Sequence, residues 1–265
     1  MRNNALHVAT WGLLAGSAAA QLADLQPGRN FTAEENFGTQ IVEDADLGDL
    51  DNDGDLDVAL ARGGDSGPMT NRIFVNQGGL QGGAVGTFVD GSATHLPGAP
   101  ADTSRAVEFV DLEGDGDLDL FVSNSSIGGA GSLGEPSRFW VNLGGLQGGG
   151  VGFYQEQTDA RWGTLVDVPP AQQVFGGNQG PFRDWSCDCD FADLDDDGAL
   201  DLLFTSYGPG TNGGKNSRIF FNDASGVFHE VWPWANATAD TKVTTWDGDL
   251  ADFDGDFDID VVIST

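Results

Sequence analysis

Residues 49–57 read Asp-Leu-Asp-Asn-Asp-Gly-Asp-Leu-Asp, with an acidic residue at every second position and glycine at the sixth. This nine-residue pattern, which we call an acidic ladder, returns three times, as Asp111-Leu-Glu-Gly-Asp-Gly-Asp-Leu-Asp119, Asp193-Leu-Asp-Asp-Asp-Gly-Ala-Leu-Asp201 and Asp252-Phe-Asp-Gly-Asp-Phe-Asp-Ile-Asp260. Carboxylates at alternate positions of a tight loop gather hard oxygen ligands around one point, which suits Ca²⁺. Without a cation, so many like charges would repel one another.

The composition is strongly acidic. The chain of 265 residues carries 42 Asp and Glu against 11 Lys and Arg, a formal net charge of −31. This balance argues against nucleic acid or an anionic membrane surface as a partner. Disorder is a competing explanation of high net charge. However, hydrophobic residues make up 39% of the chain, and each of the four ladders holds five acids, so nearly half of the acidic residues are clustered.

The first twenty residues have the features of a secretory signal peptide. Arg2 precedes a mostly apolar run from Ala5 to Leu14, and Ala18-Ala-Ala20 offers a cleavage site before Gln21. No later run approaches the roughly 20 apolar residues that a membrane helix needs. We therefore predict residues 1–20 as a signal peptide and residues 21–265 as a secreted, extracellular or cell-surface protein without membrane insertion.

The ladders begin at residues 49, 111, 193 and 252 and mark a repeating unit. Apolar runs lie before and after each ladder, and three units continue with a shared strand and a further aromatic strand. The shared strands are Asn71–Asn76, Ser137–Asn142 and Ser217–Asn222. Four short antiparallel strands per unit are typical of a propeller blade. We expect an all-β fold, a partial β-propeller with three complete four-stranded blades and the start of a fourth.

The last unit stops at Thr265, directly after its second strand. Propeller rings usually close with about 4–8 blades, and a blade cannot bury its faces alone. We therefore expect a fragment of a larger ring, completed by further blades from missing sequence or from another chain.

Each ladder predicts one metal site. Positions 1, 3, 5 and 9 offer side-chain oxygens, position 7 offers its backbone carbonyl, and glycine at position 6 allows the positive φ of a sharp bend. The predicted ligands are Asp49, Asp51, Asp53, Asp55 and Asp57; Asp111, Glu113, Asp115, Asp117 and Asp119; Asp193, Asp195, Asp197, Ala199 and Asp201; and Asp252, Asp254, Asp256, Asp258 and Asp260. Phe257 replaces the glycine in the last ladder, where positive φ costs ~1–2 kcal/mol. Of up to four Ca²⁺ sites, we expect the one at 252–260 to be the weakest.

Other interpretations of the ladders fit less well. An EF-hand needs Glu at position 12 and an exiting helix, whereas position 12 here is apolar and the exits are strands. A polar turn without metal would explain one ladder better than four in register. Mg²⁺ demands a stricter octahedron and keeps its waters, so it is less suited than Ca²⁺.

The segment Asp102–Asn124, which contains the second ladder, together with the strand Asn71–Asn76, resembles the FG-GAP/VCBS repeat family of integrin-α-like β-propellers. Phe37-Gly38 before the first ladder resembles the FG half of that motif. With four tandem copies, the resemblance covers nearly all of the chain after residue 20. It implies a calcium-stabilised propeller on a secreted or surface protein, commonly serving adhesion or ligand binding, and it does not imply a particular ligand.

A second acidic pattern lies upstream of the ladders. Three residues before position 1 stand Asp46, Glu108, Asp190 and Asp249, and five before stand Asp44, Ala106, Asp188 and Asp247. Strand alternation places these residues on one face. One hypothesis is a carboxylate ring along a central channel. The alternative is that the acids are solvated or paired with the recurring arginines, Arg72, Arg138 and Arg218.

No catalytic constellation stands out. Gly64-Asp-Ser-Gly-Pro68 is similar to a protease nucleophile turn, but only His95 and His229 could serve as its base, neither in a recognisable context. Gly78–Gly83 and Gly144–Gly149 share the sequence Gly-Gly-Leu-Gln-Gly-Gly, lack the Lys-Ser/Thr of a phosphate loop and are predicted as extended hairpin turns.

We predict a non-enzymatic binding or adhesion module for a protein or glycan ligand, with no catalytic residues. Two alternatives stay open. The chain could be the scaffold domain of an extracellular polysaccharide lyase or hydrolase, although paired catalytic carboxylates outside the ladders are not evident. It could also be a purely structural repeat in a large surface protein.

Overall fold

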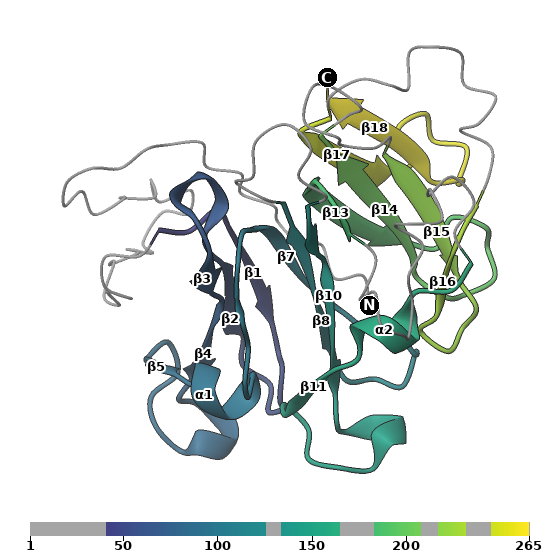
Figure 1. Cartoon of the computed structure of the whole chain (residues 1–265). Helices are drawn as coiled ribbons and strands as arrows, with labels where there is room; N and C mark the ends of the chain where they lie inside the picture. Colours follow the sequence, from purple (N-terminus) through teal and green to yellow (C-terminus); the bar gives the residue numbers. More distant parts are fainter. Residues whose placement is uncertain (1–40, 126–133, 165–182, 208–216, 232–244, 265) are drawn as a thin grey trace, which may run out of the picture.

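The computed structural model describes residues 41–125, 134–164, 183–207, 217–231 and 245–264 (Figure 1). In these ranges the fold is all-β, as predicted, and the pairings between strands are antiparallel, while two isolated bridges, Gly63 with Ser104 and Trp162 with Phe228, are parallel. The predicted signal peptide at 1–20 lies outside the described residues.

Three four-stranded sheets repeat the same strand order. Sheet 1 contains β1 (Asp44–Gly48), β2 (Asp57–Ala61), β4 (Arg72–Asn76) and β5 (Phe88–Asp90). Sheet 2 contains β7 (Ser104–Val110), β8 (Asp119–Asn124), β10 (Arg138–Asn142) and β11 (Tyr154–Glu156). Sheet 3 contains β13 (Ser186–Ala192), β14 (Asp201–Ser206), β15 (Arg218–Asn222) and β16 (Phe228–Glu230), and sheet 4 contains β17 (Asp247–Ala251) and β18 (Asp260–Ser264).

Each sheet is a meander, because strands that are neighbours in the sheet follow one another along the chain, apart from the short strands β3 and β9, which pair elsewhere. The four strands predicted for each complete unit are therefore present, and the last unit has the two strands expected before its end. Figure 1 shows the sheets following one another along the colour gradient, from purple through teal and green to yellow.

Short elements link consecutive sheets. Two small sheets of two strands each pair β3 (Met69–Thr70) with β6 (Ala101–Asp102) and β9 (Glu135–Pro136) with β12 (Arg183–Asp184). The 3-10 turns are η1 (Gly64–Ser66), η2 (Gly79–Gln81) and η3 (Gly145–Gln147), and the helices are α1 (Ser92–His95) and α2 (Thr158–Arg161). Among the described residues no helix is long and apolar enough to cross a membrane.

The hydrophobic core lies between neighbouring sheets. On β8, Leu120 and Val122 belong to a cluster shared with sheet 1, whereas Phe121 belongs to a cluster shared with sheet 3. Side chains alternate across a strand, so sheet 2 buries both faces, which explains its uninterrupted apolar runs. Between sheets 2 and 3, aromatic rings dominate, and the rings of Phe139 and Phe228 stack with centroids 5.2 Å apart.

The first strands of consecutive sheets lie side by side and are joined by carboxylates. Val107 N–H donates to Asp44 Oδ2 at 3.0 Å, and Phe109 N–H donates to Asp46 Oδ2 at 2.7 Å. The same geometry joins sheets 3 and 4, where Gly248 and Leu250 N–H groups donate to Asp188 and Asp190 at 3.0 and 2.8 Å. We call these four aspartates the carboxylate struts.

The struts modify the expectations for the upstream acids. These acids do gather along the first strands, but four of them bond to backbone N–H groups of the next sheet, a role that the sequence did not suggest. The recurring arginines have other partners, since Arg72, Arg138 and Arg218 pair with Asp90, Asp102 and Asp184. The expectation that Arg72, Arg138 and Arg218 pair with the upstream acids is therefore wrong.

Glu108 holds the equivalent position on β7. Burial, followed by the charges of Asp190, Asp46, Asp188 and Asp44, raises the pKa of Glu108 well above its usual range. Acids of β1, β7 and β13 are therefore close enough for their charges to act on one another.

Candidate metal centres

Each acidic ladder connects the first and second strands of its sheet. Position 9 is the first residue of the second strand, as Asp57 of β2, Asp119 of β8, Asp201 of β14 and Asp260 of β18. All four ladders therefore lie at the same end of the first strands, and the sheets present them as equivalent loops.

The loops bend as the sequence predicted. Position 6 has a positive φ in every ladder, with values of 95°, 92°, 92° and 79° at Gly54, Gly116, Gly198 and Phe257. Position 4, which the sequence analysis overlooked, also has a positive φ, and it is occupied by Asn52, Gly114, Asp196 and Gly255. Gly, Asn and Asp tolerate this conformation best, so the residue types at position 4 were a usable signal.

The aspartate at position 1 organises the loop. Asp49 accepts hydrogen bonds from the N–H groups of Asp53 and Gly54, both at 2.9 Å. The corresponding bonds form at Asp111, Asp193 and Asp252, with distances of 3.0–3.1 Å. Each carboxylate oxygen has more than one lone-pair site, so these bonds leave capacity for a cation.

The aspartate at position 9 ties the loop to the third strand. Asp57 accepts N–H groups from Leu50 at 3.0 Å and from Asn76 of β4 at 2.8 Å. Asp119 and Asp201 repeat both bonds with their own loop and third strand. In the last ladder Asp260 accepts from Phe253 N–H at 3.1 Å. Position 9 thus has a structural role in addition to its predicted role as a ligand.

Three ladders bring carboxylates together. One carboxylate oxygen from each of Asp49, Asp51 and Asp53 lies within 4.8 Å of the others, and the same holds for the groups Asp193, Asp195, Asp197 and Asp252, Asp254, Asp260. The second ladder differs because Glu113 Oε1 pairs with Arg161 Nη2 and accepts from Gln147 Nε2 at 3.1 Å. Three of the predicted carboxylates therefore converge in each of the first, third and fourth loops, without Asp57, Asp201 and Asp256, and among the described residues no such group forms in the second loop.

Position 7 holds buried carboxylates in the first two loops. Both side-chain oxygens of Asp55 and both of Asp117 are inaccessible to solvent and have no hydrogen-bond partner. The sequence analysis assigned only the backbone carbonyl here. A buried, unpaired carboxylate is costly, and next to other carboxylates it fits the oxygen-rich donor set that Ca²⁺ prefers.

The electrostatics of the loops show the same crowding. Burial, opposed by backbone hydrogen bonds, raises the pKa of Asp57 to about 7 and that of Asp201 to about 6. Burial together with Asp115 raises the pKa of Asp117 to about 7, and burial together with Glu113 raises that of Asp119 to about 9. Burial is the largest cause in all four groups, and carboxylates of the same loop raise the pKa values further.

The two Gly-Gly-Leu-Gln-Gly-Gly segments cover the first two loops. They do form turns between third and fourth strands, as predicted, but they also fold back onto the ladders. Leu80 N–H donates to Asp53 Oδ2 at 2.7 Å, and Gln81 Nε2 donates to Asp51 Oδ2 at 2.5 Å. Leu146 N–H donates to Asp115 Oδ2 at 2.6 Å in the second loop.

Glycine is required at this contact. A Cβ at Gly79 would lie 2.1 Å from Asp53 Oδ2, and one at Gly145 would lie 2.1 Å from Asp115 Oδ2. The available signal was the identical segment following the first and second ladders, which we interpreted only as a turn. In sheet 3 the equivalent turn is short, with Asp223 N–H bonded to Val227 O at 3.1 Å.

Comparison with known families agrees with the repeat organisation. The model of the FG-GAP-like repeat family matches residues 49–122, from the start of the first ladder into β8. This match confirms the resemblance, and the chain contains an FG-GAP-like repeat. A search of curated proteins gave no match.

Proposed function

We propose that this chain is a calcium-stabilised β-propeller-type module that is exported and serves binding or adhesion without catalysis. The repeated four-stranded sheets, their shared core and the FG-GAP-like repeat support a propeller-type arrangement. The features of residues 1–20 support export.

One observation carries the calcium proposal. Asp55 and Asp117 keep both carboxylate oxygens buried and unpaired beside other acids of the same loops. Asp49, Asp51 and Asp53 would hold the ion with Asp55 in the first loop, and Asp111, Asp115 and Asp117 would do so in the second. The ion would neutralise these charges and cross-link a loop that otherwise repels itself, so its binding free energy would become folding free energy.

The two histidines that could serve Ser66 as a base have other partners, and His229 Nε2 also lies 3.7 Å from Asp223 Oδ2. His95 Nδ1 lies 2.6 Å from the carbonyl oxygen of Gly152, and His229 Nδ1 accepts from Thr164 N–H at 3.1 Å. Both rings are thus engaged with backbone, and in the described residues neither is bonded to Ser66. Burial raises the pKa of Cys187 to about 12, which keeps its thiol protonated at neutral pH.

Thermal melting in Ca²⁺ and in chelator tests the proposal. At a Ca²⁺ concentration about 100-fold above Kd, one site adds about 2.7 kcal/mol, or roughly 5–10 °C for a domain of this size. The double variant Asp55→Asn, Asp117→Asn should keep or gain stability in chelator, because it removes repulsion, and should lose the part of the Ca²⁺-induced shift that the first two loops contribute. Asp159→Asn, a change at an exposed acid outside the ladders, is the matched control. Equal melting of the natural chain in both conditions would refute the proposal.

A further inference from the structure

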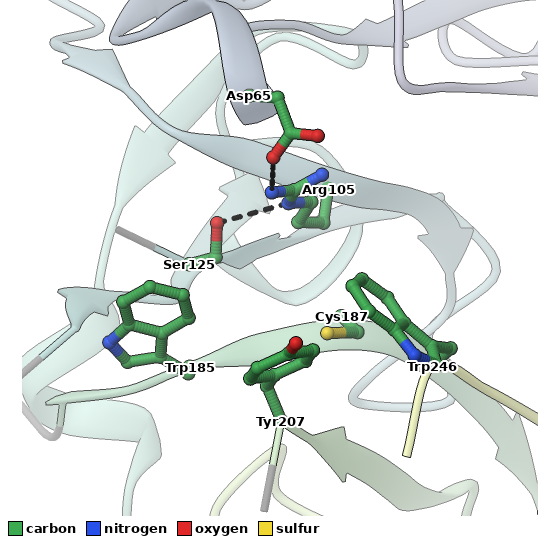
Figure 2. A pocket seen from close by; sticks show the side chains of 7 residues that line it. All are labelled: Asp65, Arg105, Ser125, Trp185, Cys187, Tyr207 and Trp246. Atoms are coloured by element: carbon green, nitrogen blue, oxygen red, sulfur yellow. Dashed lines mark hydrogen bonds and ion pairs between the residues drawn. The ribbon is translucent and has the colours of Figure 1, made fainter. Parts of the chain in front are cut away.

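A small pocket lies at the end of the first strands opposite the acidic loops. Its cavity of about 130 Å³ is lined by side chains from four consecutive sheets and their connections, among them Asp65, Arg105, Ser125, Trp185, Tyr207 and Trp246 (Figure 2). Arg105 and Cys187 stand near the beginnings of β7 and β13, whereas the ladders follow the ends of these strands. The pocket is thus separate from the candidate metal centres.

Three aromatic side chains form one wall of the pocket. The rings of Trp185 and Tyr207 have centroids 5.9 Å apart, and those of Tyr207 and Trp246 lie 4.6 Å apart at 73°. Trp246 remains 41% exposed although it is one of the largest apolar side chains. In Figure 2 the three rings stand in a row below Arg105 and Ser125. The rings are tilted by 35° and 73° against their neighbours, so the wall presents ring faces and edges, which offer apolar contact area to a ring-shaped ligand.

The opposite side of the pocket is polar and held in place. Arg105 Nε donates to Ser125 Oγ at 3.1 Å, and its two terminal nitrogens donate to Glu43 at 3.2 Å and to Asp65 at 2.5 Å. These contacts use three of the five N–H donors of a guanidinium group. Asp65 is the exposed partner, with 89% of its side chain accessible. The pocket therefore offers fixed donors, a hydroxyl and a carboxylate facing the aromatic wall.

Charge and size narrow the ligand class. Arg105 disfavours a cation, while Glu43, Asp65 and the net charge of −31 disfavour an anion. The cavity is smaller than the roughly 300 Å³ at which drug-sized pockets begin, so it suits one ring. The best match is a neutral ring with an apolar face for the aromatic wall and hydroxyl groups that both donate and accept.

We propose that this pocket binds one neutral pyranose unit of a glycan, with the sugar ring against Trp185, Tyr207 and Trp246 and its hydroxyls toward Arg105, Asp65 and Ser125. The proposal rests on the proposed binding role and gives it a site and a ligand class. It does not require a metal ion.

The test uses the full chain and the methyl glycopyranosides of glucose, galactose, mannose and xylose, with saturation-transfer NMR followed by calorimetry. We expect at least one of them to bind, and Trp246→Ala and Trp185→Ala each to weaken that binding about tenfold or more. Asp65→Asn changes an exposed side chain and should weaken it without affecting folding. Phe153→Ala removes an exposed aromatic side chain outside the pocket and should leave binding unchanged.

Three results would overturn the proposal: none of the four glycosides binds, a glycoside binds equally well to Trp246→Ala, or only glucuronate or tetramethylammonium binds. Melting of the same samples with Ca²⁺ and with chelator distinguishes the two proposals. A calcium-dependent melting temperature without glycoside binding refutes the pocket alone, and glycoside binding with calcium-independent melting refutes the metal sites alone.

Discussion

The first two acidic loops differ from the last two in what covers them. In the first loop Asp51 and Asp53 are half-buried beneath the glycine-rich turn η2, whereas their counterparts Asp195 and Asp197 in the third loop are exposed. The nine-residue motif and its internal hydrogen bonds are nearly the same in both. The difference in burial therefore comes from the turn η2, which lies more than twenty residues further along the chain. The motif determines the shape of the loop, and the segments packed against the loop determine how far its carboxylates are desolvated.

The largest expected effect on stability is a difference between position 9 of the first loop, which is covered, and position 9 of the last loop, which is open. Asp57→Ala leaves two buried N–H groups, of Leu50 and Asn76, without an acceptor and should cost about 3 kcal/mol. Asp260→Ala removes one bond to the exposed Phe253 and should cost less than about 1 kcal/mol. Urea unfolding in chelator measures both without a metal contribution. Equal losses would mean that position 9 stabilises every loop alike.

The next effect concerns the glycine-rich turn η2, which covers the first loop. Gly79→Ala places a methyl group against Asp53 at a φ of 41° and should cost about 2 kcal/mol. Gly82→Ala is the matched control, because its φ is also positive at 69° but no atom lies within 4 Å. We expect about 1 kcal/mol there. Calorimetry should also show weaker Ca²⁺ binding for Gly79→Ala alone, and a similar loss in both variants would contradict a close contact between turn and ladder.

A smaller effect is expected at the bend of the last loop. Phe257 is 87% exposed with a φ of 79°, so Phe257→Gly relieves strain and loses little packing. The relief of ~1–2 kcal/mol is partly offset by the greater chain entropy of glycine, which leaves a net gain of about 1 kcal/mol. Thermal melting in chelator measures this gain. An unchanged melting temperature would remove the reason to rank this site as the weakest.

The smallest expected effect concerns how steeply the free energy of unfolding changes with pH at Glu108. Because the pKa of Glu108 is raised, the folded state holds its proton while the unfolded state releases it near the ordinary value of 4.5. Its contribution to stability is therefore complete below pH 4.5 and is lost as the pH rises toward the folded-state pKa. Glu108→Gln should remove part of this decline and match the natural chain at low pH. If the melting temperatures of the natural chain and of Glu108→Gln change in parallel from pH 4 to 8, the raised pKa of Glu108 is contradicted.

The sequence predicted the local features of the molecule well. Four antiparallel strands per complete unit and the positive φ at Gly54 and its counterparts follow from residue types within a few positions, which limit the backbone directly. The cover over Asp53 and the bond from Val107 to Asp44 could not be predicted, because they depend on how segments far apart in the chain come together. Strand alternation grouped the upstream acids correctly and said nothing of their partners.

The carboxylate struts have a consequence for the edges of the sheets. An edge strand with open N–H groups is a template for pairing with another chain. Asp44 and Asp46 occupy two of these groups on β7, and Asp188 and Asp190 occupy two on β17. A neighbouring sheet thus blocks the edge with charged side chains instead of backbone. The carboxylate struts, which hold neighbouring sheets together, thus also protect the edges of β7 and β17 against strand addition and aggregation.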